Sequence, residues 1–510
     1  MRGPSSSHCA AAIRIGRIAR DLMDNNIKDV LVQYDIDGSL ATTHKSQGSD
    51  MGLMGGLMGM DTIDDQLVNS ETLIKSTGVR VEIQIKKLND PHPNTYRLTL
   101  SNDTQQHCVQ AISTGGGMIE IINIDDTPIK INGDYWETLL FINEKANEQN
   151  ILNNIHGNFN CDEILAHNWK QGRLIQIKSQ KPMAENLLES LHHDNNITYI
   201  KAIAPVLSIL SGKNISVPFN NCQEMLDYAN GKNLSLWQLA VEYESQRGNI
   251  SSQEVINRMT EIVRIVKQSI AEGIKGTKYH DRILGHQCGK LKEKIKTKEV
   301  LNASLTNQII LYVSALMEIK SSMGIIVAAP TAGSCAALPG SCLAIADAIP
   351  GTTDEDVAKA MLAGGLIGIF ITNRSTFAAE EAGCQAECGS ASGMAAAAMV
   401  SLAHGTTQQA IAAATMALQN SLGMVCDPVA NRVEVPCLGK NVMAAVNALA
   451  CANMALADYD PVTTLDEVIE AMDQVGRKIP REFRCTALGG LSICQSSKNI
   501  EKKLSSNNME

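Results

Sequence analysis

The pattern of apolar residues changes along the chain, and this change limits the folds that the sequence can adopt. Residues 81–85 and 96–100 alternate between apolar and polar side chains, which predicts half-buried strands, and residues 9–24 carry apolar side chains at helical spacing. From about residue 216 to residue 496 the chain instead reads as a succession of helices, several of them opening on a Ser or Asp N-cap. The sequence therefore predicts an α+β protein with a mixed α/β N-terminal domain and an all-α C-terminal domain.

The stretch between these two regions, residues 136–215, has its own order of elements. Its apolar runs predict strand, helix, strand, strand, helix and strand, which is the order of a ferredoxin-like (ACT-like) domain. Such a domain is either a regulatory module that binds an amino acid or a structural spacer, and the pattern carries no ligand signature. The expected domains are residues 1–135, 136–215 and 216–496, followed by a polar tail at 497–510 that we expect to be disordered.

The composition argues against several classes of partner. The net charge of −10 argues against nucleic acid and against an anionic membrane surface. The opening residues do not read as a secretory signal, and 14 cysteines indicate a reducing, cytoplasmic compartment with thiolate or metal chemistry. Residues 323–348 are apolar enough to suggest a membrane helix, but Pro330 and Pro339 interrupt them. We therefore expect pieces of buried helix and a loop in that stretch.

Three cysteines stand in short motifs of the helical region. Gly383-Cys384-Gln385 precedes Cys426-Asp427-Pro428 by 42 positions (426 − 384), and Pro436-Cys437 follows 11 positions later (437 − 426). None belongs to a CxxC pair, which argues against a zinc ribbon. Three thiolates from separate segments can hold three irons of a four-iron cluster and leave the fourth iron open as a Lewis acid. The alternative is that these are buried cysteines of an Ala-rich core.

Two N-terminal segments carry groups for anion binding and proton transfer. Ser5, Ser6 and Ser7 precede the first helix, where hydroxyls and free amides suit a carboxylate, and His8 adds a proton donor or acceptor. His44 and Lys45 lie in a polar segment after a strand and suit proton transfer. Each segment on its own is also consistent with a plain N-cap or an exposed loop.

Two further turns are candidates for binding. Ser113, Thr114, Gly115 and Gly116 open a glycine-rich loop that is either an anion-binding nest of backbone amides or a hairpin turn. In the helical region, Thr331 and Ser334 lie in a hydroxyl-bearing turn that leads into a helix. Asn431, five positions after Cys426, is placed to bond to a cluster sulfur or to a substrate amine.

Together these motifs resemble the iron–sulfur-dependent L-serine dehydratases (L-serine ammonia-lyases), in the single-chain form with fused β-type and α-type domains. Residues 3–8 match the GPSSSH opening of the β-type domain, and residues 39–50 match its GSLA…D loop. Residues 92–95 and 113–117 match further segments of the β-type domain. Residues 323–334 look like the MGxIVAAPTAGS motif of the α-type domain, and the three cysteine motifs follow in the family's order and spacing.

The resemblance implies a cofactor, a reaction and an assembly. Cys384, Cys426 and Cys437 would hold a [4Fe-4S] cluster, and no PLP would be needed. Cys494 is the expected candidate for a fourth ligand from the C-terminal segment, with Cys485 as another. L-serine would lose its hydroxyl and its ammonia to give pyruvate, with the serine hydroxyls and the glycine-rich loop holding the carboxylate. A homodimer is expected.

One departure from the family pattern concerns the base. The family loop is usually GKGHxTD, and alignment on Lys45 and Asp50 places Gln47 where its His belongs. A carboxamide cannot act as a general base at neutral pH. We therefore expect His44 to take the Cα proton, with His8 as the next candidate.

Two other functions remain open from the sequence. An open iron can also accept a thiolate, so a similar cluster would suit desulfuration of L-cysteine. A non-enzymatic amino-acid sensor, with zinc or no metal in its helical half, is the other alternative. Three ligand-type cysteines with no fourth at knuckle spacing argue against structural zinc, which takes four ligands.

Overall fold

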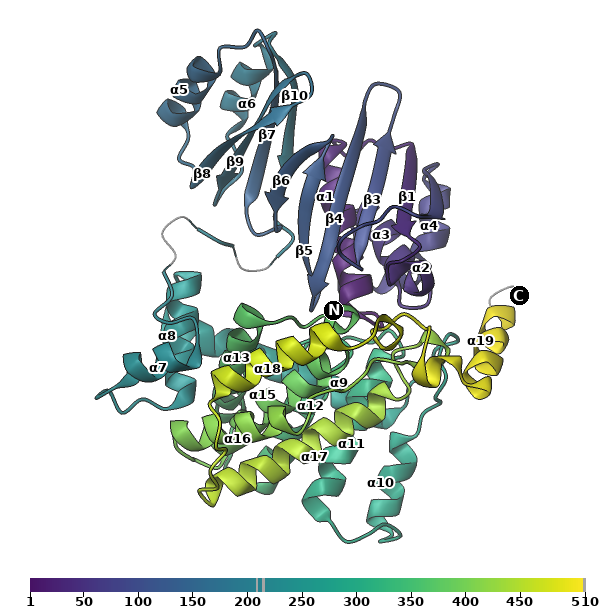
Figure 1. The fold of residues 1–510 in the computed structure, drawn as a ribbon, viewed down its shortest axis with the longest axis vertical. Coiled ribbons are helices and arrows are strands. Elements are labelled where there is room, and N and C mark those ends of the chain that lie inside the picture. Colours follow the sequence, from purple (N-terminus) through teal and green to yellow (C-terminus); the bar gives the residue numbers. More distant parts are fainter. Residues whose placement is uncertain (208–209, 213–215, 508–510) are drawn as a thin grey trace. The chain divides into compact units, whose positions relative to one another are not determined.

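The computed structural model describes residues 1–207, 210–212 and 216–507 (Figure 1). The chain divides into two compact units. Met1–Cys9, Thr42–Gly48 and Ser216–Glu510 form the unit that we call the helical unit. Ala10–Ala41 and Ser49–Ile215 form the other, which we call the sheet unit.

The first sheet of the sheet unit has six strands in the order β2-β1-β3-β4-β5-β6. β1 pairs with β2 in parallel and with β3 antiparallel, so the sheet is mixed. The strands expected at residues 81–85 and 96–100 are confirmed as β2 and β3. The bounds are β1 Asp29–Asp35, β2 Arg80–Lys86, β3 Thr95–Ser101, β4 Gln106–Gly115, β5 Met118–Ile124 and β6 Thr127–Ile131.

Helices cover this first sheet because their apolar faces pack against the apolar side chains of its strands. The π-turn η1 (Ser6–Ala10) leads into α1, whose Ile15, Ile18 and Leu22 are buried with the apolar side chains of the strands. Glycines at one face of α1 and of α3 let the two helices come close together. The bounds are α1 Ala11–Leu22, α2 Leu40–Thr43, α3 Ser49–Leu57, η2 Asp65–Asn69 and α4 Ser70–Ser76.

The second sheet of this unit has the element order that the sequence predicts. Four antiparallel strands lie in the order β10-β7-β9-β8, with α5 and α6 as the two connecting helices. Phe141 and Trp169 of this sheet belong to the same hydrophobic core as the first sheet. The two sheets are therefore parts of one compact unit. The bounds are β7 Trp136–Asn143, α5 Glu148–Asn158, β8 Glu163–Trp169, β9 Gly172–Ser179, α6 Glu185–His192 and β10 Ile197–Ile203.

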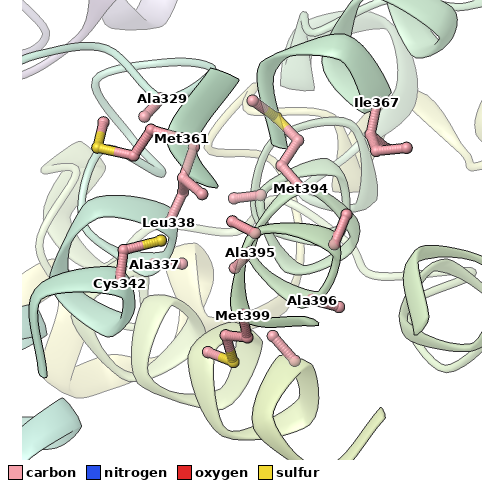
Figure 2. Packing of buried hydrophobic residues seen from close by; sticks show 14 of the residues in the cluster. Ala329, Ala337, Leu338, Cys342, Met361, Ile367, Met394, Ala395, Ala396 and Met399 are labelled. Carbon is pink, nitrogen blue, oxygen red and sulfur yellow. The ribbon is translucent and has the colours of Figure 1, made fainter. Parts of the chain in front are cut away.

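The helical unit is built around α15, a helix of small side chains. Every residue of α15 except Ser401 is buried, and α12, α13, α16 and α17 pack against it. Figure 2 shows this core, where Met394, Ala395 and Met399 of α15 lie among side chains such as Leu338 and Ile367. Alanine and glycine allow these helices to approach one another closely.

The helices of this unit are as follows. Their bounds are α7 Cys222–Ala229, α8 Leu236–Gly248, α9 Ser252–Lys275, α10 Cys288–Lys296, α11 Ser304–Lys320, α12 Ala337–Ala348, α13 Asp354–Arg374, α14 Ala379–Ala382, α15 Ser390–Leu402, α16 Thr407–Gln419, α17 Cys437–Leu456, α18 Leu465–Lys478 and α19 Gln495–Asn507, with short turns η3 Gln385–Gly389, η4 Val429–Asn431, η5 Arg481–Phe483 and η6 Gly490–Ile493.

Two sequence expectations about this unit have a clear outcome. Residues 323–348 form a loop followed by α12, as expected, but Pro339 lies in the first turn of α12, where a proline is tolerated, and does not interrupt the helix. No helix in the described part of the chain is long and apolar enough to cross a membrane. Residues 497–507 were expected to be disordered but lie in α19, because Leu504 is buried against Val429 and Ala430. The remainder of that expected tail, residues 508–510, lies outside the described residues.

The close packing of α13 on α15 predicts that alanine has opposite effects on stability at two adjacent glycines of α13. A Cβ at Gly364 would lie 2.6 Å from the carbonyl oxygen of Met394, whereas a Cβ at Gly365 would meet nothing within 4 Å. Gly365→Ala should stabilise the protein by up to about 1 kcal/mol through helix propensity. Gly364→Ala should destabilise it, because overpacking costs about 1–3 kcal/mol. Thermal unfolding of the two variants measures this, and equal shifts in Tm would contradict the packing argument.

Candidate cysteine site

A group of buried cysteines of the helical unit gathers in one region. The sulfurs of Cys384 and Cys426, with a carboxylate oxygen of Glu387, lie within 4.8 Å of one another. The Cys426 thiol is within hydrogen-bonding reach of both Cys384 and Cys485. Cys437, the first residue of α17, is close enough to Cys384 for the two sulfurs to interact electrostatically. All four side chains are buried, so the group is shielded from bulk water.

Backbone contacts hold three segments of this site in place. The amide of Cys426 donates to the carbonyl of Phe483 at 2.8 Å, and the amide of Cys485 donates to the carbonyl of Cys426 at 2.9 Å. Gly383, with φ of 71°, precedes Cys384, and a Cβ there would lie 2.6 Å from the carbonyl oxygen of Met424. These contacts fix the sulfur positions without using the sulfurs themselves.

The electrostatics of the site oppose ionisation of Cys426 and Cys437 and include two nearby lysines. Contacts with neighbouring thiols raise the pKa of Cys426, and burial raises the pKa of Cys437. Burial alone would lower the pKa of Lys440, but the nearby thiolates outweigh it and raise that pKa. Lys320 is fully buried and donates to the carbonyl of Val433. Several adjacent thiols ionise together only when positive charge is present, and a thiolate-rich donor set fits an iron–sulfur cluster.

The hydroxyl-bearing turn expected at Thr331 and Ser334 lies beside this region. Thr331 Oγ1 donates to Glu387 Oε1 at 2.7 Å and lies 3.0 Å from Ser334 Oγ. The amide of Ala332 donates to Ser6 Oγ at 3.1 Å, which joins the N-terminal serines to the turn. Burial raises the pKa of Glu387.

His8 is fully buried in a set of polar contacts. Its Nδ1 lies 3.1 Å from Ser5 Oγ and 3.4 Å from Glu380 Oε1, and its Nε2 lies 2.7 Å from Thr43 Oγ1. Burial, with a smaller contribution from His44, lowers the pKa of His8 to about 3. The imidazole is therefore neutral at physiological pH.

The segment with Gln47 is tied to Cys485. Gln47 Nε2 donates to Cys485 Sγ at 3.2 Å and to Asn431 Oδ1 at 3.4 Å. Asn431 Nδ2 donates to the carbonyl of Thr42, and Thr42 Oγ1 donates to the carbonyl of Thr486 at 2.9 Å. The residue at the position expected for a histidine base therefore contacts a cysteine sulfur.

The structure brings most of the expected site residues into one unit. His44 is half-buried, Lys45 is exposed and Ser7 is buried, while Cys494 is exposed. The expected residues that belong to the helical unit are Ser5, Ser6, Ser7, His8, His44, Lys45, Thr331, Ser334, Cys384, Cys426, Asn431, Cys437 and Cys494.

The glycine-rich loop belongs to the sheet unit and forms the hairpin turn between β4 and β5. Residues 115–117 have φ values of 99°, 61° and 89°, which suit glycine. The amide of Ser113 donates to the carbonyl of Asn94 at 3.1 Å. Among the described residues, the buried Ser113 Oγ and Asn94 Nδ2 have no hydrogen-bond partner. Thr114 is exposed.

Several residues of the site were not predicted from the sequence. Lys440 lies one helical turn after Cys437, so helical spacing could have indicated it. Glu387 stands three positions after Cys384, but nothing in the sequence marks its contact with Thr331. Lys320 is buried by tertiary packing alone and carries no sequence signal.

The chain is similar to known proteins along nearly its whole length. Residues 231–492 match the family described as serine dehydratase alpha chain. A probable L-serine dehydratase alpha chain from Bacillus subtilis is 33% identical over 286 residues, covering 56% of this chain and 95% of that protein. A probable L-serine dehydratase beta chain from the same organism is 31% identical over 208 residues, covering 40% of this chain and 94% of that protein. An L-serine dehydratase from Helicobacter pylori is 26% identical over 498 residues, covering 96% of both chains.

The burial of His8 predicts a pH dependence of stability. Its pKa falls from 6.5 to about 3 on folding, so between these values the unfolded chain binds a proton that the folded chain does not. The contribution of neutral His8 to the free energy of unfolding is therefore complete above pH 6.5 and is lost as the pH falls toward 3. Between about pH 7 and pH 5, the wild type should lose about 2 kcal/mol more stability than His8→Gln.

Urea unfolding at each pH measures this difference. His280→Gln removes an exposed histidine of the same unit and should follow the wild type. Parallel pH profiles for the wild type and His8→Gln would contradict the prediction.

Proposed function

Because the chain belongs to the serine dehydratase alpha chain family, we propose that it is an L-serine ammonia-lyase that uses a [4Fe-4S] cluster bound by Cys384, Cys426 and Cys437. The observation that carries the cluster is the convergence of these buried cysteines from separate segments. The similarity to alpha and beta chains over successive parts of the chain supports the same activity.

The reaction removes water and then ammonia from L-serine. A base takes the Cα proton and the β-hydroxyl leaves as water, which gives aminoacrylate. Its imine tautomer then reacts with water and releases ammonia and pyruvate. When bound, a cluster with one iron open to substrate supplies a Lewis acid for the departing hydroxyl.

His44 is the proposed base, and His8 is a positioning residue. His8 Nε2 contacts Thr43 Oγ1, next in sequence to His44, so it helps to hold the turn that carries the base. Lys45, which is exposed, is proposed to assist proton transfer. The hydroxyls of Ser5, Ser6 and Ser7 are proposed to bind the carboxylate, and a role of the glycine-rich turn in binding stays a prediction from the sequence.

Cys485 is a better candidate than Cys494 for a fourth cluster ligand. Cys485 is buried, lies within reach of Cys426 and accepts a hydrogen bond from Gln47. Cys494 is exposed. Cys485 would serve as this ligand in the resting enzyme.

The second sheet supports the ferredoxin-like assignment of residues 136–215. Its order β10-β7-β9-β8 places the first and last strands side by side and the two middle strands at the other edge. An ACT-like role in binding a regulatory amino acid remains part of this proposal, as does assembly into a homodimer.

The first test is pyruvate release from L-serine by anaerobically purified, cluster-reconstituted protein. We expect turnover that is lost in air, and we expect Cys384→Ser to lose both bound iron and activity. Cys342→Ser, which changes a buried cysteine elsewhere in the helical unit, should retain both. A full cluster with no pyruvate would contradict the proposal, and activity on L-cysteine alone would indicate a desulfurating lyase.

The second test separates the two histidines. His44→Gln should lower kcat by at least about 100-fold with the iron content unchanged, because a general base contributes about that factor or more. His8→Gln, which keeps hydrogen-bonding groups, should lower kcat less and leave the shape of the pH–rate profile unchanged. Normal turnover by His44→Gln with an intact cluster would exclude His44 as the base.

A further inference from the structure

A second group of metal-ligand residues lies where α10 begins beside α11 (Figure 1). A ring nitrogen of His286, Sγ of Cys288 and a carboxylate oxygen of Glu318 lie within 4.8 Å of one another. None of the three belongs to the cysteine site described above. His286 is half-buried, and the other two residues are buried.

Two polar atoms of this group face each other without satisfied hydrogen bonds. Among the described residues, His286 Nε2 and Glu318 Oε2 are buried and have no hydrogen-bond partner. They are 4.0 Å apart, which is too long for a hydrogen bond between them. Glu318 is only 1% exposed, so an unsatisfied carboxylate oxygen there is costly.

The rest of the group is already fixed in place. Glu318 Oε1 accepts hydrogen bonds from the amides of Gln287 at 3.0 Å and Cys288 at 2.9 Å, which leaves Oε2 directed toward His286. A Cβ at Gly289 would lie 2.6 Å from His286 Cε1, so the glycine makes room for the ring. The carboxylate and the ring are therefore oriented by their surroundings.

We propose that His286, Cys288 and Glu318 bind Zn²⁺, with water as the fourth ligand. Nitrogen, thiolate and carboxylate are the donors that Zn²⁺ takes in proteins, and three protein ligands with one water form an open tetrahedral site. His286 is half-buried, so the group lies next to solvent, from which the water ligand would come. Cys288 Sγ now donates to the carbonyl of Gly273 at 3.1 Å, and binding replaces this bond as the thiol proton passes to solvent.

The metal would join three parts of the helical unit. It would connect the segment after α9 and the start of α10 to Glu318, near the end of α11. The segment that follows α11 contains Thr331 of the cysteine site. The alternative is a protonated His286 paired with Glu318 and no metal, and it predicts no zinc.

The test is zinc binding by full-length protein carrying its iron–sulfur cluster. Zinc and iron are counted separately by mass spectrometry after the protein is stripped of loose metal and titrated with Zn²⁺ against a chromophoric chelator. The wild type should bind one zinc in addition to its iron. His286→Ala and Cys288→Ser should each weaken zinc binding at least about 10-fold without loss of iron, because each removes one of the ligands. Cys342→Ser should bind zinc as the wild type does.

X-ray absorption at the zinc edge identifies the ligands independently of the variants. The proposed site predicts one sulfur and otherwise nitrogen or oxygen ligands. Several sulfurs would place the zinc at the cluster cysteines and overturn the proposal. No bound zinc, or zinc retained in both variants, would overturn it as well. Circular dichroism establishes that the variants are folded, and the half-buried His286 is the less disruptive site to change.

Discussion

The cysteine site depends on holding several sulfurs together in a buried place. Burial and mutual contact both oppose ionisation of the thiols, so they do not assemble the site by their own attraction. Backbone hydrogen bonds instead join Cys426 to Phe483 and to Cys485. A cation that binds such a preformed set gains thiolate ligands without having to order the chain.

The packing of small side chains around α15 sets where part of this site lies. α17 begins at Cys437 and packs against α15, so its position determines that of the cysteine. Large side chains in α15 would separate the helices and move Cys437 away from Cys384. The Ala-rich composition of the helical half is therefore a condition for the site as well as for the core.

The sequence predicted the strands, the helical half and the motif cysteines because each has a local signal. Alternation marks β2 and β3, and fixed motifs mark Cys384, Cys426 and Cys437. The bond from Ala332 to Ser6 has no such signal, because it joins segments 326 positions apart. The helix at the C-terminus was missed for a similar reason, since two buried residues, Ser497 and Leu504, anchor a segment whose composition is otherwise polar.

Gln47 shows how the site accommodates the absence of a histidine. Its amide donates to Cys485 Sγ, and a carboxamide neither gains nor loses a proton at neutral pH. A histidine in that place would carry a proton whose binding depends on the charge of the sulfur beside it. With a carboxamide there, proton transfer falls to His44 in the proposed mechanism, while His8 remains neutral through burial. In that mechanism, different residues hold the sulfur and move the proton.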